Sequence, residues 1–132
     1  MPALIMAWKT GPALVAGNAL IIKPASSTPL TCMEIASVIR GAGVPEDTLR
    51  VIPGSGSEAG AAIASHPEIR AVSFTGSAET GKIVEAAACG TGKRLTLELG
   101  GSDPMIVCDD ADIAAAVAGL SLIHISEPTR PY

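Results

Sequence analysis

The sequence predicts an α/β fold with a doubly wound, mostly parallel sheet. Short, continuously apolar runs alternate with helical segments, and this alternation is typical of parallel strands covered on both faces by crossover helices. Hydrophobic residues make up 48% of the chain, while Phe, Tyr and Trp occur once each, so the core must be built from aliphatic side chains. The 132 residues are the length of one domain.

Turn residues and apolar periodicity define the expected elements in order. A helix is expected over residues 3–15, and a Gly-Asn turn leads from it into a strand in residues 19–23. Thr28 and Pro29 suit the start of a helix that ends at Gly41 or Gly43. The further expected elements are strands in 48–54, 69–76, 93–100 and 104–108, and helices in 57–66, 77–88 and from about 110.

The pattern of strands and helices changes near Leu120. The final segment, LSLIHISEPTRPY, resembles the in-frame translation of an adapter used to prepare sequencing libraries with a transposon. We therefore separate residues 1–119, which carry the fold, from a non-native, adapter-derived tail in residues 120–132. His124 falls in that tail and is given no role.

Charge and cysteine content exclude several classes of function. The net charge is −4 with acids and bases interspersed, so we expect neither nucleic acid nor a membrane as a partner. The apolar N-terminal stretch is interrupted by Lys9 and Gly17, well short of the ~20 residues that a membrane span needs. The three cysteines are far apart with no C-x-x-C pair or secretory leader, which predicts a cytoplasmic location and no metal site.

Two glycine-containing turns are candidate nucleotide sites. VIPGSGSEAG matches a relaxed dinucleotide fingerprint at Gly54, Gly56 and Ala59, although no acid ends the next strand as that fingerprint requires. FTGSAETG places Thr75 to Ser77 where a strand passes into a helix and backbone N–H groups favour an anion. Both segments are also explained without a ligand, the first as a strand-to-helix turn and the second as an ordinary helix cap.

Two further segments carry candidate charged groups. In IIKPASSTP, Lys23 and Ser26 offer a cation and a hydroxyl that suit a phosphorylated ribose; the alternative is a solvated lysine before a helix cap. In LTLELGG, Glu98 stands between two leucines, where desolvation would disfavour its charged form and suit it to act as a general base. The alternative is a solvated or ion-paired acid.

Together these segments resemble the aldehyde dehydrogenase superfamily. The successive stretches WK…PALVAGN…KP, PG.G, FTGS and LELGG, within residues 2–117, correspond to its coenzyme-binding domain. The resemblance implies that residues 1–119 form part of this Rossmann-like domain, in an enzyme that oxidises a small aldehyde to a carboxylate with NAD(P). The sequence is most similar to the succinate-semialdehyde dehydrogenase branch of the family. The resemblance also implies that the full-length protein is a homo-oligomer.

The resemblance also implies how the adenosine end of the coenzyme is held. Lys23 would bind the ribose hydroxyls, Trp8 would line the same side, and Gly56 would lie beneath the ribose. NAD-preferring members often place a glutamate three residues after the lysine, where this chain has Ser26. A carboxylate repels a 2′-phosphate and a serine can donate to it, so NADP is the expected coenzyme and NAD the alternative.

The remaining implied positions lie at the reactive end. Thr75 and Leu99 would lie near the nicotinamide, and Gly76 and Ser77 would hold the pyrophosphate. Glu98 matches the general base of the family, which activates the catalytic thiol or the deacylating water.

The other catalytic groups of the family have no match in these residues. The nucleophilic cysteine belongs in a Gly-Gln-x-Cys segment and the oxyanion asparagine in a W-N-x-P segment, and neither Cys89 nor Cys108 fits. We therefore expect these 132 residues to be inactive by themselves. A non-catalytic coenzyme-binding module is the alternative, and an acylating relative that uses coenzyme A is disfavoured because such relatives commonly lack the base at Glu98.

Overall fold

The computed structural model describes residues 2–101 and 106–126 and confirms an α/β fold with parallel strands. In chain order its elements are α1 (Pro2–Val15), β1 (Leu20–Ile22), α2 (Pro29–Gly41), the 3₁₀ turn η1 (Glu46–Thr48), β2 (Leu49–Val51), the π-helical turn η2 (Gly56–Gly60), α3 (Ala61–Ser65), β3 (Ala71–Gly76), α4 (Ala78–Ala88), β4 (Arg94–Leu99) and α5 (Ile113–Ser126).

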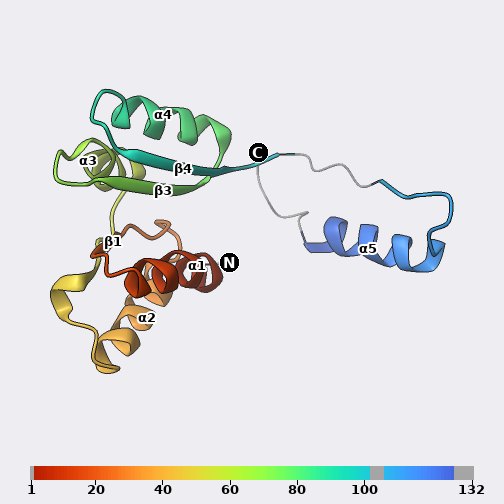
Figure 1. Ribbon diagram of the computed structural model, residues 1–132, viewed down its shortest axis with the longest axis horizontal. Coiled ribbons are helices and arrows are strands. Elements are labelled where there is room, and N and C mark those ends of the chain that lie inside the picture. The colour runs from red at the N-terminus through yellow and green to blue at the C-terminus, as the bar shows by residue number, and fades with distance from the viewer. Residues whose placement is uncertain (1, 102–105, 127–132) are drawn as a thin grey trace.

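The four strands of the described chain form two separate parallel pairs. β1 lies beside β2, with Leu20 opposite Leu49, and β3 lies beside β4, with Ala71 opposite Arg94. Each pair is joined by a crossover helix, α2 in the first and α4 in the second, as parallel strands require. Figure 1 shows α4 running along β3 and β4, with α1 and α2 on the other side of the molecule and α5 apart from both pairs.

The largest buried cluster lies in the first half of the chain, where α1 and α2 pack on β1 and β2. Its buried members are Met6, Cys32, Ala36 and Leu49, and the side chain of Leu49 is fully enclosed (0% exposed). Burial raises the pKa of the Cys32 thiol. None of these four residues is aromatic, which agrees with the composition, although Met6 and Cys32 are sulfur-containing rather than aliphatic.

The second half of the chain packs α4 against one face of β3 and β4. α4 begins after Ser77, whose Oγ accepts from the Thr80 N–H at 3.2 Å and so caps the helix. Gly81 is buried where a Cβ atom would come within 2.6 Å of the Leu99 side chain. The leucines at alternate positions of β4 therefore face α4.

Two expectations about the C-terminal part need correction. The strand expected in residues 104–108 is not formed at Ile106 to Cys108, and Ile106 is 84% exposed; residues 104 and 105 lie outside the described residues. An isolated segment cannot form a strand because its N–H and C=O groups need a neighbouring strand. The helix expected from about residue 110 begins at Ile113 and continues through Leu120 to Ser126, and the adapter origin of the tail stays a prediction.

The other differences are at element boundaries. The strands expected over 19–23 and 48–54 shorten to three residues each, and the helix expected over 57–66 divides into η2 and α3. No described helix is both long and apolar enough to cross a membrane. Within residues 2–101 and 106–126, no three acidic, His or Cys side chains are grouped as a metal site would require.

Candidate coenzyme and base site

Apart from Trp8, which lies in α1, the predicted site residues lie at or just after the C-terminal ends of the four strands. Lys23 directly follows β1, the Gly54 to Gly56 turn follows β2, and Thr75 and Glu98 lie near the ends of β3 and β4. This edge is where open α/β sheets bind ligands. The residues at these strand ends form two groups, one at the end of the β1–β2 pair and one at the end of the β3–β4 pair.

The first group joins the ends of β1 and β2. The Ser26 hydroxyl donates to the Gly54 carbonyl oxygen at 3.3 Å. The Lys23 Cδ atom lies 3.6 Å from the position that a Cβ on Gly60 would occupy. Gly56 has no neighbouring atom within 4 Å of such a position, so the chain leaves open space there. This arrangement brings Lys23 and Ser26 to the two ends of the η2 turn.

The η2 turn itself is held by Ser55. Its Oγ accepts from the backbone N–H of Glu58 at 3.1 Å and donates to the Glu58 carboxylate at 3.0 Å. The Ser57 hydroxyl lies 3.3 Å from the Ser55 Oγ. The turn after β2 therefore carries a carboxylate that is hydrogen-bonded within the turn, which the sequence patterns did not single out.

The second group joins the ends of β3 and β4. Thr75 is opposite Glu98 and Gly76 is opposite Leu99 in the parallel register, and the Gly100 N–H donates to the Gly76 carbonyl at 3.3 Å. A Cβ on Gly76 would lie 2.5 Å from the Phe74 ring, so a side chain there would require the ring to move. The register places four of the predicted residues side by side.

Ser77 occupies the helix cap that its sequence pattern also allowed. Besides accepting from the Thr80 N–H, its hydroxyl donates to the Thr80 Oγ1 at 3.0 Å. Because this hydroxyl is engaged within the chain, an anion at the start of α4 would be bound by backbone N–H groups.

The environment of Glu98 differs from the one its flanking leucines predict. Side chains alternate along a strand, so Leu97 and Leu99 face one side of β4 while Glu98 faces the other. On that other side Glu98 is exposed. The predicted desolvation of this carboxylate is therefore wrong for the chain as it stands.

The sequence patterns missed a lysine on the same side of the β3–β4 pair. Lys9 of α1 donates from Nζ to the Ser73 Oγ at 2.6 Å. Burial lowers the pKa of Lys9, and the negative charge of Glu98 partly opposes this by raising it. A charged residue inside an otherwise apolar helix was the available signal. Trp8, the neighbour of Lys9 on α1, is 67% exposed.

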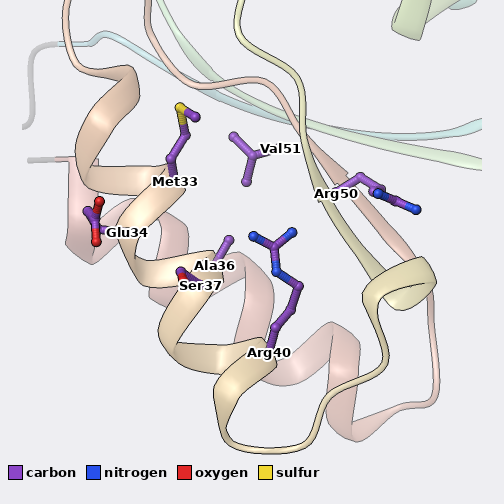
Figure 2. A pocket seen from close by; sticks show the side chains of 7 residues that line it. All are labelled: Met33, Glu34, Ala36, Ser37, Arg40, Arg50 and Val51. Atoms are coloured by element: carbon purple, nitrogen blue, oxygen red, sulfur yellow. The ribbon is translucent and has the colours of Figure 1, made fainter.

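Two cavities among the described residues lie away from the predicted site. The larger, about 390 Å³, lies between α2 and β2, and Figure 2 shows Arg40 reaching from α2 toward the strand. The smaller, about 280 Å³, lies at the C-terminal end of α4. The larger is lined by Met33, Glu34, Ala36, Ser37, Arg40, Arg50 and Val51. Neither contains a residue of the predicted site.

Sequence comparison identifies related proteins over most of the chain. The profile of the aldehyde dehydrogenase family matches residues 1–124. Retinaldehyde dehydrogenase 3 of Mus musculus is 52% identical over 117 residues, which are 88% of this chain and 23% of the relative. Aldehyde dehydrogenase, cytosolic 1, of Mus musculus is also 52% identical over 117 residues, 88% of this chain and 23% of that protein.

Comparison with solved structures also finds aldehyde dehydrogenases. Succinate-semialdehyde dehydrogenase from Burkholderia pseudomallei superposes with a TM-score of 0.87 at 45% identity, over 93% of this chain and 26% of that one. PnpE in complex with nicotinamide adenine dinucleotide superposes with a TM-score of 0.86 at 42% identity, over 92% and 25%. The chain thus spans about a quarter of the length of the proteins that it matches.

Proposed function

Since this chain belongs to the aldehyde dehydrogenase family, we propose that residues 1–119 are part of the coenzyme-binding domain of an NAD(P)-dependent enzyme that oxidises a small aldehyde to a carboxylate. The observation that carries this proposal is the placement of the predicted groups at the C-terminal ends of all four strands, with Thr75 and Glu98 opposite one another. That edge is the ligand-binding edge of open α/β sheets.

The residues at this edge fit a dinucleotide. Open space at Gly56 leaves room for a group from outside the chain, and the cation of Lys23 lies beside the same turn. On the second strand pair, the start of α4 after Gly76 and Ser77 offers backbone N–H groups to a pyrophosphate. We propose that Lys23, Trp8, Ser26 and Gly56 bind the adenosine half.

The reactive end is proposed to lie on the second strand pair. Thr75 and Leu99 would border the nicotinamide, which accepts the hydride when the coenzyme is bound. Glu98 would take the proton from a thiol or a water. Its exposure in this chain leaves its carboxylate accessible to such a group.

These 132 residues are proposed to lack dehydrogenase activity by themselves. They contain Glu98 but neither of the segments in which the family carries its nucleophilic cysteine and its oxyanion asparagine, and acyl transfer requires both groups. Purified chain mixed with succinate semialdehyde and NADP is expected to form no NADPH, measured by absorbance. Aldehyde-dependent NADPH formation above a protein-free control would contradict this.

NADP is the proposed coenzyme because Ser26 is exposed at the turn and carries no charge. The test is a titration of the chain with NADP and with NAD, followed by the fluorescence of Trp8, the only tryptophan. Ser26→Glu is expected to weaken NADP binding by about tenfold or more while NAD binding changes little, because a carboxylate repels the 2′-phosphate.

Ser27→Glu provides the matched control, since it adds the same charge one residue away. Equal loss of both coenzymes in Ser26→Glu would contradict the assignment of Ser26. Absence of binding of either coenzyme to the unsubstituted chain would contradict the coenzyme site itself. Binding without any turnover in a longer protein that contains this segment would favour the alternative function, a non-catalytic coenzyme-binding module.

The proposed substrate is a small aldehyde, and the similar proteins indicate which aldehydes to test first. Similarity to succinate-semialdehyde dehydrogenase at 45% identity supports succinate semialdehyde as the first substrate to test. Similarity to retinaldehyde dehydrogenase 3 at 52% identity makes retinal the comparison substrate. The relative named as cytosolic supports a cytoplasmic location, and homo-oligomeric assembly of the full-length protein is proposed from the family.

A further inference from the structure

The turn that follows β2 carries an exposed acidic side chain that is hydrogen-bonded within the turn. Glu58 lies in the first turn of η2, and its carboxylate accepts from the Ser55 hydroxyl at 3.0 Å. The same hydroxyl accepts from the Glu58 N–H at 3.1 Å. The Ser55 hydroxyl therefore bonds both the backbone and the carboxylate of Glu58, which keeps the carboxylate beside its own turn.

This turn is bounded by the two residues proposed to face the adenosine ribose. Ser26 donates to the carbonyl of Gly54, which precedes the turn. The side chain of Lys23 lies against Gly60, which ends it. The Glu58 carboxylate is bonded to Ser55, the residue next to Gly54, so its charge lies at the end of the turn that Ser26 contacts.

The charges on this surface are not neutralised within the described chain. The ion pairs found in residues 2–101 and 106–126 are those of Arg50 with Glu46 and with Asp47, so neither Glu58 nor Lys23 is in an ion pair there. The η2 turn and the Lys23 side chain against it thus have one negative and one positive side chain without an ion-pair partner among the described residues. Over distances below the Debye length of about 10 Å at moderate salt, both charges act on a bound ligand.

We propose that Glu58 is a second determinant of coenzyme choice, which disfavours a coenzyme with a 2′-phosphate and opposes the effect of Ser26. The inference rests on the proposed coenzyme site. A carboxylate near the ribose repels a phosphate dianion but tolerates free ribose hydroxyls, which donate hydrogen bonds. With Ser26 favouring NADP and Glu58 favouring NAD, the chain discriminates weakly between the two coenzymes.

The test compares NADP and NAD affinities of Glu58→Gln with those of the unsubstituted 132-residue chain, by calorimetric titration. Glu58→Gln keeps the size of the side chain and removes its charge. NADP binding is expected to tighten by about three- to tenfold, the range for one charge acting on a dianion through a largely aqueous path, while NAD binding stays nearly constant. Glu68→Gln, which removes an exposed carboxylate outside the turn, is expected to change neither affinity.

A second variant and the salt dependence separate an electrostatic role from a structural one. Glu58→Arg is expected to tighten NADP binding further, by about tenfold or more, because the charge is reversed. The gain in NADP affinity of both variants over the unsubstituted chain is expected to decrease at high salt, since salt screens the charge of residue 58. Equal changes in NAD and NADP affinity, or changes insensitive to salt, would overturn the inference. If the unsubstituted chain bound neither coenzyme, that result would contradict the proposed coenzyme site itself and not the role of Glu58 alone.

Discussion

Glu98→Gln, placed in a catalytically complete protein that contains this segment, is expected to lower kcat by about 10²–10⁴, the range for loss of a general base. Glutamine keeps the shape of the side chain but cannot accept the proton. The register that sets Thr75 opposite Glu98 does not depend on the carboxylate charge. Binding of the coenzyme, measured by titration, is therefore expected to stay near its original affinity.

Glu85→Gln is the matched control for this experiment, because Glu85 is an exposed carboxylate of α4 outside the proposed site. It is expected to leave kcat and KM unchanged. A loss of kcat below about tenfold in Glu98→Gln would show that another group serves as the base. An equal loss in both variants would show that the effect is not specific to this carboxylate.

Leu49→Ala is expected to destabilise the chain by about 3 kcal/mol, the middle of the range for a buried leucine. The side chain of Leu49 is fully enclosed between α1, α2 and β1, and its removal leaves a cavity at the centre of that cluster. Domains of this size are stable by only about 5–15 kcal/mol. The variant is expected to unfold at clearly lower urea concentration, measured by circular dichroism.

Ile83→Ala is the control for the core substitution. Ile83 is 63% exposed on α4, and an exposed aliphatic side chain contributes within about 0.5 kcal/mol. If Leu49→Ala and Ile83→Ala destabilised the chain equally, the buried cluster around Leu49 would not be the main source of stability.

The elements that local chemistry determines could be predicted from the sequence. Ser77 was expected to start a helix and caps α4, and Pro29 is the first residue of α2. The parallel pairing of the strands also agrees with the apolar runs that alternate with helices. For the two helix starts, the residues that decide the structure are neighbours in the chain.

The features that depend on distant neighbours could not be predicted. A strand was expected at residues 104–108 because the segment is apolar, but Ile106 to Cys108, the part of it that the structure describes, form no strand. Glu98 was expected to be desolvated because leucines flank it, but the alternation of side chains turns it to an exposed face. The bond between Lys9 and Ser73 joins residues 64 positions apart, and no local pattern indicates such a contact.

The division of the sheet into two parallel pairs has a consequence for cooperativity. β1 and β2 share their hydrogen bonds only with each other in the described chain, as do β3 and β4, so one pair can open without breaking the backbone bonds of the other. A dinucleotide bound by Lys23 on one pair and by Ser77 on the other would join them. Its binding would then couple the local unfolding of the two pairs. In the presence of the ligand, both pairs would unfold together in one cooperative transition.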